Sequence, residues 1–221
     1  MKMKNLRGLA CTLLLGSALS GAWAAIDVSG VPVDETITVA GTPLTLNGAG
    51  FRKRGYFKVD VTALYTTQKV SSVEALEKLP GTKRLELIIQ QDISGSQASR
   101  YVLIDFEASA TPAEFAQLIN EVSQIGGIYS ALPKIKKGDI VAIDIIPGKG
   151  AMASLNGTPL IPHGATTPYF NNDLLAKIFL RMYVAGKTPA ELHDNLLGLS
   201  NSMRTPGAST PDTAAKAASA H

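Results

Sequence analysis

A run of alternating polar and apolar residues, preceded by three cations, is the feature that most constrains the fold of this chain. It covers residues 57–65 and follows Arg52, Lys53 and Arg54. Successive side chains of a β-strand point to opposite faces, so every second residue shares a face. One face carries Lys58, Asp60 and Thr62, and the other carries Phe57, Val59, Val61 and Tyr65. The pattern predicts a strand over 54–66 whose polar face is turned either to water or to a cavity that holds an anionic or carbonyl-bearing group.

Further strands are expected in hairpin groups. Alternating runs around residues 40–42 and around Asn156-Gly157 predict two hairpins, the second with a type I′ turn. Gly48 and Gly50 are expected to loosen the backbone before the strand that starts at 54. The mostly apolar segments 83–90 and 140–146 predict two more strands.

Helices are expected in the middle and at the end of the chain. Ser71, Thr111 and Thr188 each precede a glutamate by three residues, which is the capping-box pattern of a helix start. Gly126 and Gly127 are expected to end the helix that begins at 111. The expected helices cover 71–79, 94–110, 111–127, 173–184 and 188–197. Hairpins grouped apart from helices indicate an α+β fold in which helices cover one face of an antiparallel sheet.

The two ends of the chain differ in composition from the middle. Residues 1–25 combine a basic start, a short apolar run and a small-residue cleavage pattern, which predict a secretory signal peptide rather than a stable membrane span. Residues 201–221 predict a disordered tail, because from 204 on they are rich in Ala, Ser, Thr and Pro and lack large apolar residues. One domain is therefore expected over 26–200, in a protein exported to the periplasm.

Charge and residue content argue against several classes of function. The excess of 21 Lys and Arg over 18 Asp and Glu lies within the expected signal peptide, at Lys2, Lys4 and Arg7. The remaining chain is formally neutral without a basic stripe, so no nucleic-acid partner is expected. The single cysteine, Cys11, and three scattered histidines show no metal-ligand spacing, so neither a metal nor a cofactor is expected.

Several short motifs follow one another in an order that resembles the chalcone isomerase-like family. They are NGAGFR at 47–52, VTALY at 61–65, KKGD at 136–139, PGKG at 147–150, LNG at 155–157, LLAKIFL at 174–180 and GKTP at 186–189. The resemblance covers about 31–198 and is strongest to bacterial exported members. It implies an open-faced β-sandwich, a large antiparallel sheet covered by a layer of helices.

The resemblance also implies a cleft with an arginine, and Arg52 matches that position. A guanidinium can hold a phenolate or carboxylate through its planar, permanently charged fork. The alternative is that Arg52 is a solvated residue of a basic turn. Asp60 falls where the family enzyme has a threonine and its fatty-acid-binding relatives have a tyrosine. Thr62 replaces that threonine only if a bulge shifts the register, and Asp60 would repel a bound carboxylate unless it pairs with Arg52 or Lys58.

The other catalytic positions of the family enzyme transfer poorly to this chain. Its helix tyrosine and asparagine fall near Ala98 and Asp105, and its late-helix threonine falls near Leu180. Tyr101 lies one helical turn from the missing phenol, either at the cleft or in the core.

Three functions follow from the resemblance. The first is a non-catalytic binder of a small apolar or amphipathic ligand with a carboxylate or phenolic group, with Arg52, Asp60, Thr62, Tyr101 and Asp105 as candidate ligand-binding residues. The second is an isomerase or lyase that catalyses an intramolecular addition, with Arg52, Thr62 and Tyr101 as candidate catalytic residues. The third is a structural partner protein with a filled core and no ligand.

Overall fold

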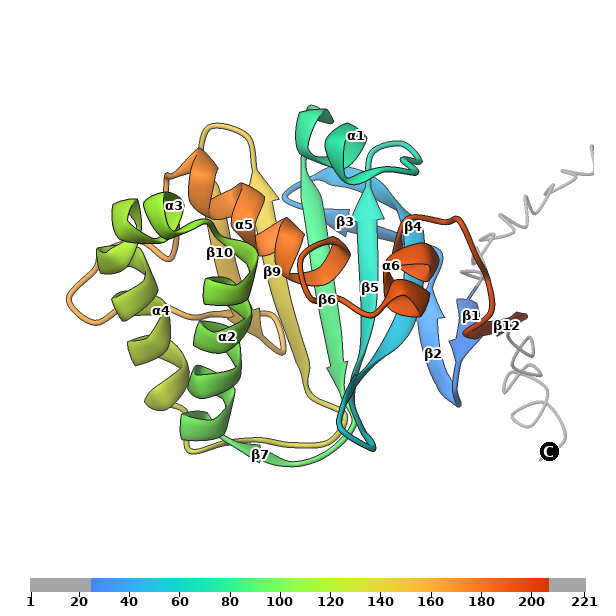
Figure 1. Ribbon diagram of the computed structural model, residues 1–221, viewed down its shortest axis with the longest axis horizontal. Helices are drawn as coiled ribbons and strands as arrows, with labels where there is room; N and C mark the ends of the chain where they lie inside the picture. Colours follow the sequence, from blue (N-terminus) through green and yellow to red (C-terminus); the bar gives the residue numbers. More distant parts are fainter. Residues whose placement is uncertain (1–24, 207–221) are drawn as a thin grey trace, which may run out of the picture.

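A computed structural model of the chain describes residues 25–206. The expected signal peptide, apart from Ala25, and the expected tail beyond Pro206 lie outside the described residues. The strands are β1 (Ala25–Val28), β2 (Val31–Asp34), β3 (Thr36–Val39), β4 (Thr42–Arg54), β5 (Phe57–Thr66), β6 (Lys83–Ile89), β7 (Ile93–Ser94), β8 (Lys134–Ile135), β9 (Ile140–Ile146), β10 (Gly150–Leu155), β11 (Thr158–Pro159) and β12 (Arg204–Pro206). Seven of them form an antiparallel sheet in the order β11-β10-β9-β6-β5-β4-β3 (Figure 1).

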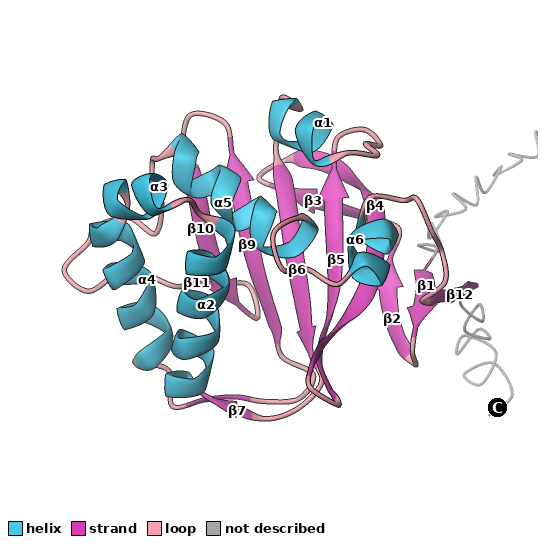
Figure 2. Ribbon diagram, in the orientation of Figure 1, coloured by secondary structure: helices cyan, strands magenta, loops and turns pink. Residues whose placement is uncertain are grey.

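The helices gather on one face of this sheet, as Figure 2 shows in cyan. They are α1 (Val73–Lys78), α2 (Gly95–Ser109), α3 (Pro112–Gln117), α4 (Ile119–Ser130), α5 (Asp173–Val184) and α6 (Ala190–Leu196). Helix α5 is strongly amphipathic and buries its apolar side chains against the sheet and α2. The predicted α+β fold, a large antiparallel sheet covered by helices, is confirmed. No helix within residues 25–206 is long and apolar enough to cross a membrane.

The strands around the first hairpin differ from the prediction in one respect. The hairpin turns at Ala40 and Gly41, both with positive φ, as expected. However, Gly48 and Gly50 do not interrupt the backbone, because β4 continues through them to Arg54. A Cβ atom at residue 48 would lie 2.0 Å from the carbonyl oxygen of Asn195, so the glycine permits α6 to pack closely on the strand.

The helix boundaries need three corrections. The segment predicted as one helix over 111–127 is two helices that meet at Leu118, and Gly126 and Gly127 lie inside α4 rather than ending it. Gly126 sits where α4 packs on α2, and its carbonyl accepts a hydrogen bond from Ser99. Ser72, not Ser71, caps α1 through the backbone NH of Ala75. Helix α6 begins after Pro189 without the expected side-chain cap from Thr188.

Residues 201–206 are ordered, in contrast to the expectation of a disordered tail from residue 201. Met203 is buried, and Arg204–Pro206 pairs with β1 as the edge strand of a small sheet, β12-β1-β2. Backbone pairing with β1 supplies the ordering that side-chain composition did not predict.

Strand β6 lies at the centre of the large sheet, which agrees with its mostly apolar sequence. Lys83, Leu85, Leu87 and Ile89 on its helix-facing side are buried. In the neighbouring strand, Asp60 and Thr62 pair with Ile89 and Leu87, and therefore share this helix-facing side. Asp60 and Thr62 of the polar face predicted for β5 thus point into the protein, toward the helices, whereas Lys58 is exposed.

Candidate functional site

A small cavity lies between the helix-facing side of the sheet and helices α2, α4 and α5. Its volume is about 40 Å³, and apolar side chains from three sheet strands and α2 form much of its wall. These are Val59, Leu87, Ile89, Val141, Ala98 and Val102. The polar side chains that line it include Arg52 and Asp60 from the sheet, Asp105 from α2, and two tyrosines from α4 and α5. The volume suffices for about two or three water molecules.

Arg52 and Asp60 form a cross-strand ion pair at the wall of this cavity. They are direct partners in the β4–β5 register, next to a bulge between Arg52 and Lys53. Nε and Nη2 of Arg52 donate to Oδ2 of Asp60 at 2.9 and 2.7 Å. The hydroxyl of Thr62 donates to Oδ1 of the same carboxylate at 2.7 Å. Both oxygens of this buried carboxylate are thereby hydrogen-bonded.

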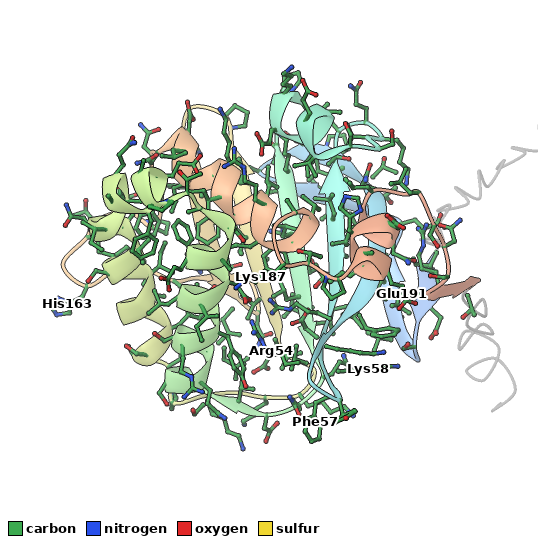
Figure 3. All side chains as sticks on the ribbon, in the orientation of Figure 1. Arg54, Phe57, Lys58, His163, Lys187 and Glu191 are labelled. Atoms are coloured by element: carbon green, nitrogen blue, oxygen red, sulfur yellow. The ribbon has the colours of Figure 1, made fainter. Side chains whose placement is uncertain are left out.

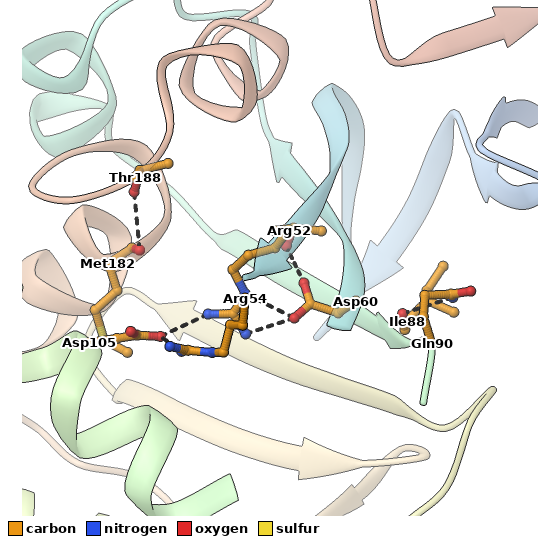
Figure 4. Close-up of polar contacts among 9 residues, drawn as sticks. Arg52, Arg54, Asp60, Ile88, Gln90, Asp105, Met182 and Thr188 are labelled. Atoms are coloured by element: carbon orange, nitrogen blue, oxygen red, sulfur yellow. Dashed lines mark hydrogen bonds and ion pairs between the residues drawn. The ribbon is translucent and has the colours of Figure 1, made fainter. Parts of the chain in front are cut away.

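A second carboxylate, Asp105 of α2, extends the ion pair across to the helix layer. Nη1 of Arg52 donates to its Oδ2 at 2.9 Å, and Nη2 of Arg54 donates to the same oxygen (Figure 4). The guanidinium of Arg54 also stacks 4.2 Å from the ring centroid of Tyr101. Two guanidinium groups and two carboxylates thus form one network with no net charge.

Burial and charge together set the protonation of the network. Burial alone lowers the pKa of Arg52, but the charges of Asp60 and Asp105 and the nearby phenol of Tyr183 raise it above its ordinary value. Arg52 is therefore a permanent cation whose side chain is 16 % exposed. The expectation that it is a solvated turn residue is wrong, because it lies within β4 beneath α2 and α5.

Two buried tyrosines face Arg52 from the helix layer. The guanidinium of Arg52 lies 5.1 Å from the ring centroid of Tyr183. Burial raises the pKa of Tyr183 to about 12, with Arg52 acting against the shift. Burial likewise raises the pKa of Tyr129. Neither hydroxyl has a hydrogen-bond partner among residues 25–206, so both can donate to a molecule in the cavity.

The ion-pair network separates this inner cavity from an outer hollow of about 240 Å³. Arg52 and Asp105 line both spaces. Arg54 and Lys187 also line the outer hollow, as does Lys53, whose ammonium group contacts Phe51, and apolar side chains of α2, α5 and α6 bound it. An anionic group that approaches through the outer hollow therefore meets cations before it reaches the apolar cavity.

All five predicted ligand-binding residues meet at this site. Arg52, Asp60 and Thr62 come from the hairpin β4–β5, and Tyr101 and Asp105 come from α2. Tyr101 lines the cavity instead of lying in the core. Thr62 lies two residues from Asp60 on the same face of β5, and its hydroxyl hydrogen-bonds to the Asp60 carboxylate. Thr62 therefore does not replace Asp60 as the partner of Arg52.

Sequence reasoning missed three polar residues of the site: Arg54, Tyr129 and Tyr183. Arg54 and Arg52 have the same parity in β4 and therefore share a face, which could have identified Arg54. Tyr183 lies one helical turn after Leu180, a position already marked by the family resemblance. No local pattern marks Tyr129.

The arrangement places a guanidinium and two phenols beside an apolar cavity wall. Ala98, near which the resemblance places the phenol of the family enzyme, lines the cavity, and Leu180, near which it places the threonine, is buried. Within residues 25–206 no three His, Cys, Asp or Glu side chains are grouped as a metal site.

Comparison with known proteins agrees with the fold. The chain matches a family described as chalcone isomerase-like over residues 25–198. No curated protein matches it. Its structure is similar to that of a fatty-acid binding protein of Arabidopsis thaliana, AtFAP1, with a TM-score of 0.63 and 12 % sequence identity over 80 % of this chain and 98 % of that chain. At this identity the likeness shows the fold, a large curled antiparallel sheet with helices on one face. The chain belongs to the chalcone isomerase-like family.

Proposed function

We propose that this protein is exported to the periplasm and binds a small apolar molecule with a carboxylate or phenolic oxygen, without catalysing a reaction on it. The observation that carries the proposal is the position of the Arg52 guanidinium, between a cationic outer hollow and an apolar inner cavity. The likeness to a fatty-acid binding protein supports the same class of ligand at the level of the fold.

The ligand's anionic oxygen would compete with Asp105 for Arg52 and Arg54. Asp60 is held by Thr62 and by two donors of Arg52, whereas Asp105 accepts from one nitrogen of each arginine. The side chain of Asp105 is also the more exposed, at 20 % against 2 % for Asp60. Displacement of Asp105 therefore costs less than displacement of Asp60.

An apolar chain of several carbons needs more room than about 40 Å³. Helix α2 contributes Ala98, Tyr101, Val102 and Asp105 to the cavity wall, and it contacts α4 and α5 more than the sheet. Release of Asp105 frees α2 from its ion pair with β4. Binding is thus expected to shift α2 outward and enlarge the cavity.

Titration with dodecanoate, using dodecanol as an uncharged probe, tests the proposal. Removal of Arg52 alone would leave Asp60 as an unpaired buried charge, so the test uses the paired variant Arg52→Met/Asp60→Asn. Loss of the charged hydrogen bonds is expected to weaken dodecanoate binding by about 1.5–3 kcal/mol and to leave dodecanol binding nearly unchanged.

A matched control is the pair Arg84→Met/Asp144→Asn, which removes a bidentate ion pair elsewhere in the sheet, between β6 and β9. This control should bind dodecanoate as the unmodified protein does. Unchanged dodecanoate affinity in the Arg52→Met/Asp60→Asn variant would show that these two residues do not bind the ligand. Turnover of a hydroxychalcone above the rate in buffer would contradict the non-catalytic role.

A further inference from the structure

The turn between β4 and β5 exposes two aromatic side chains at the end of the sheet. Tyr56 is 100 % exposed and Phe57 is 67 % exposed. Figure 3 shows Phe57 and Lys58 at the lower end of the molecule, with Phe57 pointing away from the helices. An exposed aromatic pair at a turn makes no contribution to the core, and aromatic rings of this kind are typical of contact surfaces.

Lysines flank these aromatic residues in an arrangement that costs stability. Lys53 and Lys58 are direct partners across the β4–β5 pair, and like charges opposite each other destabilise a sheet. Their ammonium groups lie 5.0 and 4.2 Å from the ring centroid of Phe51, which places both on the same side of the hairpin. The ammonium group of Lys58 also donates to the hydroxyl of Ser29 at 2.9 Å, but no carboxylate among residues 25–206 pairs with either lysine, so both charges remain available to an anionic partner.

A second turn adds two more lysines at the same end of the sheet. Lys136 and Lys137 lie in the turn between β8 and β9. The backbone of Gly138 and Asp139, in this turn, hydrogen-bonds to the backbone of Ile89. The backbone NH of Gln90, which follows Ile89, donates to the carbonyl of Val59 in β5. Among residues 25–206, none of Lys53, Lys58, Lys136 and Lys137 forms a salt bridge. The nearby acids are engaged otherwise: Asp92 pairs with Lys134, and Asp139 accepts from Asn156 and from the backbone of Lys136.

From these observations we infer that this end of the protein, here called the tip surface and composed of Lys53, Tyr56, Phe57, Lys58, Lys136 and Lys137, docks on the surface of an anionic lipid bilayer. Aromatic rings partition into the head-group layer, and each nearby lysine adds attraction to anionic lipids. Two exposed aromatic residues offer much less area than the roughly 800 Å² per partner of a stable protein interface, so a bilayer fits better than a second protein.

The docking does not depend on the proposed ligand. Lys53 nevertheless belongs to both the tip surface and the outer hollow, so a docked protein would hold the hollow close to the lipid head groups. A molecule with an apolar chain could then pass between bilayer and protein over a short distance.

Sedimentation with vesicles tests the inference. Protein obtained by expression of the whole chain is mixed with vesicles of phosphatidylcholine alone or with added phosphatidylglycerol. We expect binding to the anionic vesicles, which weakens as salt is added. Lys53→Gln/Lys58→Gln should weaken this binding about 25-fold, at about fivefold for each lysine. Tyr56→Ser/Phe57→Ser should weaken it at least tenfold.

The matched control is Ile119→Ser/Leu199→Ser, which removes two apolar side chains that are 54 % and 56 % exposed but lie outside the tip surface. This control should bind the vesicles as the unmodified protein does. Because all variants have the same chain ends, any contribution of those ends to vesicle binding cancels in the comparison. In Phe57→Trp, the indole fluorescence should shift to the blue on addition of anionic vesicles. Equal binding of all variants, no binding to anionic vesicles, or self-association that depends on Phe57 would each overturn the inference.

Discussion

At the residue scale, the main feature of the site is that the protein supplies its own carboxylates to the arginine that would bind a ligand. Asp60 and Asp105 together accept from three nitrogens of Arg52. An internal carboxylate of this kind keeps a buried guanidinium paired when no ligand is bound. The affinity for an anionic ligand is therefore set by a difference: the free energy gained when the ligand's oxygen binds Arg52, less the free energy lost when the internal carboxylate is displaced.

Substitution Asp105→Asn tests this competition. The amide keeps the shape of the side chain and can still accept a hydrogen bond, but it no longer repels a ligand carboxylate or neutralises the two arginines. We expect dodecanoate to bind roughly tenfold more tightly, which corresponds to about 1.4 kcal/mol. Titration calorimetry measures the change. Glu107→Gln, on the exposed side of the same helix, is the control and should leave the affinity unchanged. Weaker dodecanoate binding in Asp105→Asn would assign Asp105 a direct role in holding the ligand.

Residues of the site were predictable from the sequence where a strand pattern fixed their direction or where the family resemblance marked their position. The alternation of β5 placed Asp60 and Thr62 on one face, and the resemblance marked Arg52 and Asp105. Tyr129 and Tyr183 were not predicted because an aromatic residue on an amphipathic helix is ordinarily core. Their role depends on where α4 and α5 pass over Arg52, which local sequence does not determine.

At the element scale, several errors of prediction come from glycines whose role is packing. Gly48, Gly126 and Gly127 were interpreted as interruptions, since glycine has high backbone freedom. In the structure Gly48 and Gly126 lie at contacts between elements, where the absence of a side chain matters more than backbone freedom. Hairpin turns were predicted correctly because Gly41 and Asn156-Gly157 adopt positive φ readily and lie between alternating runs. Close contacts between distant segments leave no comparable local pattern.

The contact between β4 and α6 gives a test of this interpretation. In Gly48→Ala the new methyl group would meet the carbonyl oxygens of Asn195 and Leu196 at 2.0 and 2.5 Å, so α6 must move. That movement would also disturb the 2.7 Å hydrogen bond from the Asn47 side chain to Leu196. We expect a loss of about 2–4 kcal/mol in the free energy of unfolding, measured by urea denaturation.

Gly127→Ala is the matched control for this substitution. A methyl group at residue 127 has no atom within 4 Å, apart from neighbours along its own helix. Alanine is favoured over glycine inside a helix, so this variant should gain up to about 1 kcal/mol. Equal effects of the two substitutions would show that the β4–α6 contact does not require glycine.

At the scale of the whole molecule, buried phenols should determine how the protein responds to alkaline solution. Burial raises the pKa of Tyr65, Tyr129 and Tyr183, the last to about 12. A folded-state pKa above the unfolded value means that the folded protein keeps protons that the unfolded chain loses. Stability from these tyrosines is therefore complete below about pH 10 and falls as the pH rises above it. Burial lowers the pKa of Lys69 and Lys83, so these two lysines raise the stability of the fold as the pH rises. Their contribution stops changing above about pH 10.5, the ordinary pKa of lysine.

The contribution of Tyr183 to this loss can be isolated with Tyr183→Phe. A shift of about two pKa units corresponds to about 3 kcal/mol lost between pH 10 and 12. The phenylalanine variant lacks the ionisable hydroxyl of Tyr183. Its free energy of unfolding should therefore fall by about 3 kcal/mol less over the same interval. Urea denaturation at pH 9, 10, 11 and 12, with return to pH 9 to check reversibility, measures both slopes. The Tyr183 hydroxyl has no partner within residues 25–206, so the two proteins should differ little at pH 9. Parallel losses above pH 10 would mean that water reaches this phenol, and hence that the cavity beneath α5 is open to solvent.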